Sequence, residues 1–253
     1  MVATPIVAGN WKMNKTPTEA CSFIQESVNL LLDIDRVKVI FLPPFTGLFD
    51  MHVEHPFSLG AQNCHWEDQG AFTGEISVGM LKDCGVSYVI VGHSERRHVF
   101  SETNDWINRK VKAIIAADLI PILCIGETFE QRKSGQTNQV LEEQLQDGLE
   151  MINSLEKLVV AYEPVWAIGT GITASVEQVS GALSLVRDIL SIQFSDSNID
   201  NSPIIYGGSV TPTNAEELIS VPGVDGFLVG GASLNIESFT SIIKIVDKII
   251  LNK

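Results

Sequence analysis

Short apolar runs alternate along the chain with longer segments in which apolar residues recur every three or four positions. The runs are rich in Val, Ile and Leu, as expected of parallel strands that are buried on both faces. Eight strands are predicted in this way, at residues 5–12, 37–42, 58–62, 88–92, 121–126, 158–163, 203–206 and 225–229. They start about 31 residues apart, which is the length of one strand–helix–strand unit.

The segments between the runs carry signals for the start of a helix. Ser or Thr followed three positions later by Glu or Gln forms a capping box, and such boxes begin at Thr16, Ser175 and Thr213. Apolar residues then fall on one helical face, at Ala20, Phe23, Ile24, Val28 and Leu31 after the first box and at Val179, Leu183, Val186 and Leu190 after the second. Each helix therefore has one side that can cover a sheet.

Eight such units follow one another without a low-complexity linker or a change in composition. This predicts an α/β protein in which residues 1–253 form one domain, a single (β/α)8 barrel of eight parallel strands with outer helices. A doubly wound open sheet is the alternative. Eight evenly spaced repeats without a domain break favour the closed barrel.

Polar residues stand where the predicted strands end, and in a barrel the carboxyl ends of the strands carry the chemistry. These residues are Asn10 and Lys12, His93, Glu163, the turn at 207–209 with Ser209, and Gly230 with Gly231. Taken singly, each has an ordinary explanation: Lys12 could extend to solvent, and Glu163 could belong to a turn before Pro164. Together, a carboxylate, an ammonium, an imidazole and two glycine turns at one barrel mouth indicate a catalytic site.

The formal net charge of −14 at pH 7 argues against nucleic acid or an anionic membrane as a partner, since either needs a basic surface. An anionic substrate would have to be bound by local positive groups. The four cysteines lie far apart without a C-x-x-C pair, which is typical of free thiols in a reducing compartment, and they are expected to be inert core residues. With no targeting segment and no apolar run of about 18 residues, the expectation is a soluble cytoplasmic protein.

Seven longer motifs resemble the triosephosphate isomerase family in order and spacing. They are GNWKMN from residue 9, GAFTGEIS from 70, VGHSERR from 91, PILCIGET from 121, AYEPVWAIGTG from 161, YGGSV from 206 and GFLVGGASL from 226. The resemblance implies a TIM barrel that interconverts dihydroxyacetone phosphate and glyceraldehyde 3-phosphate through a cis-enediolate, a step of glycolysis and gluconeogenesis. It also implies that no metal or organic cofactor takes part.

The same resemblance implies roles for individual residues. Glu163 corresponds to the base and His93 to the electrophile, while Asn10 and Lys12 correspond to residues that bind the substrate. The backbone amides of Gly169, Ser209, Gly230 and Gly231 correspond to those that hold its phosphate. The resemblance further implies a homodimer joined through residues 62–77, with Thr73 reaching the neighbouring active site.

These roles agree with elementary chemistry. Moving a proton between adjacent carbons of a phosphorylated hydroxy-ketone needs one base and donors for the enediolate oxygens. Donors already in place in a dry pocket stabilise such an oxyanion by roughly 3–4 kcal/mol each. Glycine turns let backbone N–H groups approach a phosphate closely. A phosphate-binding barrel without catalysis, or a surface binding protein, remains the alternative, but neither would need Glu163 and His93 together.

Residues 164–174 resemble the lid of the family. A dinucleotide fingerprint at Gly169, Gly171 and Ala174 is a competing interpretation, but five residues separate Glu163 from Gly169, whereas the fingerprint starts directly after its strand. Ile172 stands where the family usually has lysine, and this departure concerns the kinetics of the lid's C-terminal hinge rather than the chemistry.

Three other features are open to simple interpretations. His52 and His55 are too sparse for a zinc site. The charged stretch 127–133 is predicted to be a solvated loop and the start of a helix. Glu95 either orients Lys12 or forms a surface salt bridge.

Overall fold

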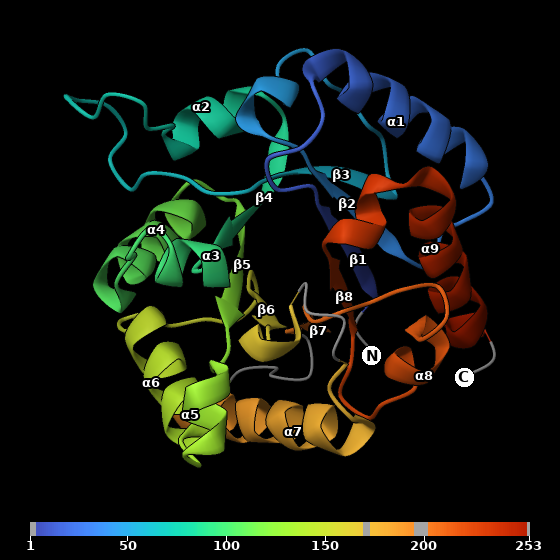
Figure 1. The fold of residues 1–253 in the computed structure, drawn as a ribbon. Helices are drawn as coiled ribbons and strands as arrows, with labels where there is room; N and C mark the ends of the chain where they lie inside the picture. Colours follow the sequence, from blue (N-terminus) through green and yellow to red (C-terminus); the bar gives the residue numbers. More distant parts are fainter. Residues whose placement is uncertain (1–3, 169–172, 195–201, 252–253) are drawn as a thin grey trace.

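The computed structural model describes residues 4–168, 173–194 and 202–251. Eight parallel strands form a closed barrel in chain order, and β8 pairs with β1 (Figure 1). The strands are β1 (Ile6–Asn10), β2 (Lys38–Leu42), β3 (Phe57–Ala61), β4 (Val86–Val91), β5 (Ile120–Ile125), β6 (Val159–Tyr162), β7 (Ile204–Tyr206) and β8 (Gly226–Val229). All eight predicted strands are confirmed, and the closed barrel excludes the open sheet.

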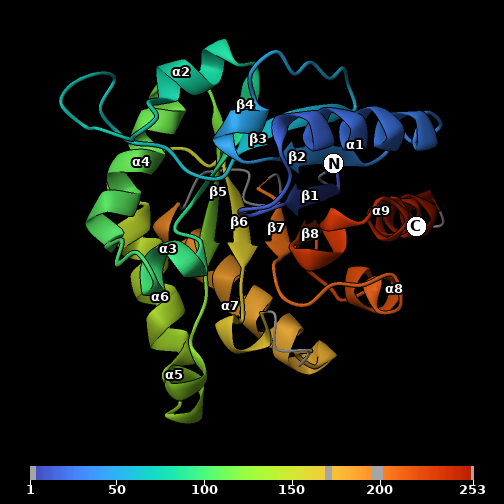
Figure 2. The ribbon, with the colours of Figure 1, turned by 45° about the horizontal axis from the view of Figure 1, so that its top comes forward.

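The helices form a ring around these strands, as Figures 1 and 2 show from two directions. They are α1 (Pro17–Leu30), α2 (Val78–Asp83), α3 (Ser94–His98), α4 (Asn104–Ala116), α5 (Phe129–Lys133), α6 (Thr137–Gly148), α7 (Val176–Gln193), α8 (Ala215–Ile219) and α9 (Ile236–Leu251), with short 3-10 turns η1 (Phe45–Gly47), η2 (Val165–Ala167) and η4 (Gly231–Leu234). The last helix, α9, lies beside α1 and closes the ring. Among the described helices, none has the length and apolar content needed to cross a membrane.

Neighbouring residues along each strand face two different cores. In β2, Ile40 and Leu42 pack inside the barrel, whereas Val39 and Phe41 pack between the barrel and the helices. Both sides of the strand are therefore dry, which explains why the strands appear in the sequence as continuous apolar runs rather than as alternating ones.

Two of the three predicted capping boxes are confirmed. The hydroxyls of Thr16 and Ser175 each accept a hydrogen bond from the third residue of the helix that follows, and the side chain of that residue bonds back. The prediction at Thr213 is wrong. Its hydroxyl pairs with that of Thr211, and the N-cap of α8 is Asn214, whose side chain binds the loop after β7 instead of the helix.

Candidate active site

A cavity of about 210 Å³ opens at the carboxyl ends of the strands. Asn10, Lys12, His93, Glu163, Ser209, Gly230 and Gly231 all line it, together with Ile168, Gly207, Gly208, Val210, Thr211, Leu228 and Ala232. The structure thus brings together every predicted site residue that it describes. Gly169 and Ile172 lie outside the described residues. The sequence analysis assigned no role to Thr211, which directly follows YGGSV, or to Ile168, which lies within AYEPVWAIGTG.

Glu163 directly follows β6 and is almost fully buried. The backbone N–H of Ser94 donates a hydrogen bond of 3.0 Å to its Oε2, and the Nε2 of His93 lies 3.2 Å from its Oε1. A β-carbon at position 207 would lie 2.8 Å from the Glu163 Cγ, so the turn after β7 needs glycine to leave room for this side chain. The carboxylate is therefore held on its β4 side by hydrogen-bond donors.

His93 precedes α3 and acts as its N-cap, because its Nδ1 accepts a hydrogen bond of 3.2 Å from the backbone N–H of Glu95. A ring nitrogen that accepts carries no proton. The single proton of the neutral imidazole therefore sits on Nε2, which can donate to Glu163 and faces the cavity. The Glu95 N–H at the start of α3 therefore favours the tautomer of His93 with its proton on Nε2. An electrophilic role needs this tautomer.

Lys12 does not end β1, as the sequence suggested, because the strand stops at Asn10. Its backbone has φ of 52°, a left-handed conformation that is rare outside glycine. Two side-chain amides support this turn: Asn10 Oδ1 accepts from the Lys12 N–H at 3.1 Å, and Gln62 Nε2 donates to the Lys12 carbonyl at 2.9 Å. Lys12 Nζ pairs with Glu95 Oε1 at 2.6 Å. Because Lys12 also lines the cavity, Glu95 holds the ammonium at the mouth of the barrel.

Residues of the loops after β7 and β8 also line the cavity. Asn214 holds the first loop, since its Nδ2 donates to the Ser209 carbonyl at 3.0 Å and its Oδ1 accepts from the Thr211 N–H at 2.8 Å. Ser233 holds the second loop through a hydroxyl bond of 2.7 Å to the Gly230 carbonyl. Both loops are thus shaped by side chains that lie just outside the pocket.

The prediction of a solvated segment at residues 127–133 is wrong for Glu127, which is fully buried. Its carboxylate accepts hydrogen bonds from Arg132 at 2.9 Å, from Trp166 at 3.0 Å and from the Tyr162 hydroxyl. Burial, and then the charge of Glu127, raises the pKa of the Tyr162 phenol well above its usual value. Glu127 therefore ties the segment after β6 to α5, which the local sequence could not reveal.

Arg97 is another residue to which sequence reasoning assigned no role. It donates to the carbonyls of Gly92 at 2.7 Å and Cys124 at 3.0 Å, which joins the ends of β4 and β5 behind His93. Burial lowers the pKa of its guanidinium to about 10. A single arginine within a short helix has no periodic signature, so only the fold exposes this contact.

The structure also decides between the two interpretations of the glycines near residue 170. The strand β6 ends at Tyr162, η2 occupies Val165–Ala167, and α7 begins only at Val176. A dinucleotide fingerprint needs a glycine turn that runs directly from a strand into a helix. That interpretation is therefore excluded. Among the described residues, no group of three or more His, Cys, Asp or Glu side chains is arranged to hold a metal ion.

Comparisons with known proteins agree with this geometry. The family model described as triosephosphate isomerase matches residues 5–246. Triosephosphate isomerases of Carboxydothermus hydrogenoformans and Syntrophotalea carbinolica are each 49% identical over 245 residues, with 95% of this chain and 98% and 97% of theirs covered. The crystal structure of triosephosphate isomerase from Bartonella henselae superposes with a TM-score of 0.87 at 38% identity, over 96% of this chain and 98% of that one. The chain belongs to the triosephosphate isomerase family.

Proposed function

We propose that this cavity interconverts dihydroxyacetone phosphate and glyceraldehyde 3-phosphate, the reaction of the family, with Glu163 as the base. The observation that carries the assignment is the contact of Glu163 with the neutral His93 at the barrel mouth, beside the ammonium of Lys12. Neither a phosphate-binding barrel without catalysis nor a surface binding protein accounts for this arrangement.

In the proposed reaction, the Glu163 carboxylate takes a proton from the carbon next to the substrate carbonyl, and the electron pair moves onto the carbonyl oxygen to give an enediolate. The hydroxyl proton passes from its oxygen to the former carbonyl oxygen, and the protonated Glu163 returns its proton to the former carbonyl carbon, so that the new carbonyl forms on the carbon that lost the first proton. His93 Nε2–H and the Lys12 ammonium stabilise the enediolate oxygens, and the side chain of Asn10 orients the substrate beside Lys12. Donors held in place before the reaction cost no reorganisation when the charge develops.

The hydrogen bond from Ser94 to Glu163 has a consequence for the proposed proton transfer. The Glu163 Oε2 accepts from the Ser94 N–H, so this bond has to break before the carboxylate can approach a substrate carbon. The Ser94 N–H thus gives the carboxylate a hydrogen-bond partner that competes with the proposed approach to substrate.

The phosphate is proposed to bind to the backbone N–H groups of Ser209, Gly230 and Gly231. Gly230 and Gly231 open η4, and the first N–H groups of a helix have no acceptor within it. Among the described residues that line the cavity, Lys12 is the one cationic side chain. These local groups allow a chain of net charge −14 to bind a dianion. Gly169, outside the described residues, is proposed to add its amide when the lid closes.

A coupled assay with glyceraldehyde 3-phosphate as substrate tests the proposed function directly. The purified chain is expected to isomerise it without added metal or cofactor. A rate no higher than that of buffer, combined with tight binding of a phosphorylated substrate analogue, would establish the binding barrel instead.

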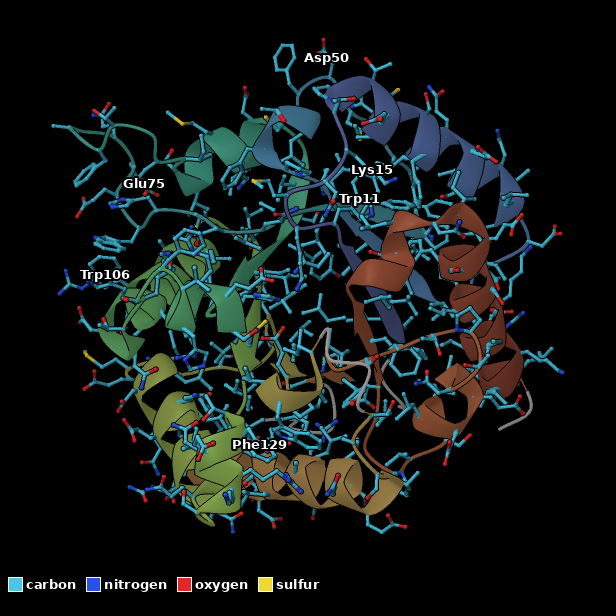
Figure 3. The ribbon with its side chains drawn as sticks, viewed as in Figure 1. Trp11, Lys15, Asp50, Glu75, Trp106 and Phe129 are labelled. Carbon is cyan, nitrogen blue, oxygen red and sulfur yellow. The ribbon has the colours of Figure 1, made fainter. Side chains whose placement is uncertain are left out.

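A homodimer is also proposed. The middle of the segment 62–77, exposed at residues 67–75, projects away from the barrel in Figures 1 and 2, and Figure 3 places Glu75 on this projection. Large apolar side chains nearby are exposed in the single chain, including Phe72 at 42%, Met80 at 54% and Met13 at 95%. Exposed apolar side chains on and beside a projecting loop support an interface with a second copy, and a twofold dimer is the commonest symmetric assembly.

We predict that Thr73→Arg separates the dimer and lowers kcat, because the proposed interface lies beside the neighbouring active site. The parent should sediment at micromolar concentration at twice the chain mass of 27.6 kDa. Ile192→Arg, at a residue that is 81% exposed on α7, is the control and should stay dimeric. A parent that runs as a single chain with full activity would refute the proposal.

We also propose that the protein is cytoplasmic. All four cysteines are unpaired, as in a reducing compartment. The expectation that they are inert core residues is wrong for Cys21, which is exposed on α1. Fractionation of the source cells, with activity followed in each fraction, tests this placement.

A further inference from the structure

The carboxyl ends of β5 and β6 are joined directly behind Glu163. The Glu163 N–H donates to the Ile125 carbonyl at 2.7 Å, and the Val165 N–H donates to the Glu127 carbonyl at 3.1 Å. Between these bonds lies Gly126, where a β-carbon would overlap the Glu163 carbonyl group. We call this contact between residues 125–127 and 163–165 the seam. The backbone of Glu163 therefore takes its position from Gly126.

Gly126 is itself held by one side chain from outside the barrel. Gln144 lies on α6, which covers the outer side of β5 (Figure 1), and is only 9% exposed. Its Oε1 accepts from the Gly126 N–H at 2.8 Å, and its Nε2 donates to the Gly126 carbonyl at 3.2 Å. One primary amide thus satisfies both backbone groups of one residue, which no carboxylate or apolar side chain can do.

We propose that Gln144 is a positioning residue for the proton transfer: by holding Gly126, it places the backbone of Glu163 and of the segment that follows it. The proposal rests on the proposed function of Glu163 as the base. Gln144 does not line the cavity and so acts only through the seam.

The expected effect follows from the geometry. Without the Gln144 amide, the N–H and the carbonyl of Gly126 would be buried without hydrogen-bond partners. Such unpaired groups cost free energy, which favours a rearrangement that pairs them again. The backbone of the seam can provide new hydrogen-bond partners for Gly126 only if it is displaced. A displacement of the reacting group by about 1 Å can lower the rate of a positioned reaction about 10²-fold.

Asn108 offers a matched control. It is also a buried amide on an outer helix, 5% exposed on α4, and its Nδ2 donates to the carbonyls of Gly148 and Glu150 at 3.1 and 3.0 Å. Those carbonyls belong to the end of α6 and to the residues after it, not to the seam or the cavity. Its loss should lower stability without moving Glu163.

The experiment compares Gln144→Met with Asn108→Leu, since both replace a buried amide by an apolar side chain of similar size. Both variants should melt at a lower temperature than the parent. Only Gln144→Met should lower kcat, by about 10-fold or more, with KM within about twofold. Only Gln144→Met should also speed hydrogen exchange in a peptide that spans residues 158–168, where the seam protects the Glu163 and Val165 amides.

Parental kcat and parental exchange in Gln144→Met would overturn the proposal, as would an equal loss of kcat in Asn108→Leu with parental exchange in the 158–168 peptide. If Gln144→Met does not fold, Gln144→Glu replaces it, because its carboxylate keeps the acceptor for the Gly126 N–H and loses the donor. If the parent chain has no isomerase activity, the proposed function fails, and the exchange measurement still decides whether Gln144 holds the seam.

Discussion

Glu163→Gln is expected to abolish most turnover, lowering kcat by about 10⁴-fold, because an amide of nearly the same shape cannot accept a proton from carbon. Glu163→Asp should be less severe. It keeps the carboxylate but withdraws it by one methylene, and a misplacement of about 1 Å costs about 10²-fold. KM should move little in both variants, since the proposed phosphate-binding amides lie on the loops after β7 and β8. Steady-state kinetics on both variants measures these effects.

A thermal melt beside the kinetics separates this role from a structural one. A structural Glu163 would tolerate glutamine better than aspartate, because glutamine fills the buried space and can still accept from the Ser94 N–H. Replacing a structural Glu163 would then lower the melting temperature rather than kcat. A Glu163→Gln enzyme with the parental kcat would refute the assignment of the base.

Lys12→Met is expected to lower kcat/KM by about 10³-fold, because the variant loses the cationic donor proposed to face both the phosphate and the enediolate. The fold should persist. The ion pair with Glu95 has 29% and 46% of its side chains exposed, and such exposed pairs contribute little to stability. Kinetics and circular dichroism on the same preparation check both statements.

Lys82→Met provides the control for Lys12→Met. Lys82 Nζ also makes a short hydrogen bond, 2.7 Å to the Ala117 carbonyl, but Lys82 does not line the cavity. Its kcat/KM should therefore match the parent. If Lys12→Met stayed within about threefold of the parent, Lys12 would supply less than roughly 0.7 kcal/mol of transition-state stabilisation and would simply extend to solvent.

Much of the fold could be predicted because each strand is buried on both faces and each long helix on one. These environments repeat with fixed periods, so β2 and α7 are recognisable from their own residues. The residues that line the cavity were predicted for a related reason. A closed parallel barrel gathers the ends of all its strands at one mouth, so Asn10, His93 and Glu163 had to lie close together once the fold was known.

Contacts between residues far apart in the sequence leave no such pattern. Glu127 looked solvated because its stretch is charged, yet Arg132, Tyr162 and Trp166 enclose it once β5 lies beside β6. Thr213 looked like a helix cap, but the N-cap of α8 is its neighbour Asn214, whose side chain binds the loop after β7.

The sequence by itself thus determined the eight-unit barrel and the set of reactive groups at its mouth, because periodic burial and strand ends are local properties. Only the tertiary structure decided how those groups are held. Gln62 supports the left-handed backbone of Lys12, the start of α3 fixes the tautomer of His93, and Gln144 holds the seam behind Glu163. Each of these depends on a hydrogen bond whose geometry exists only after the chain has closed.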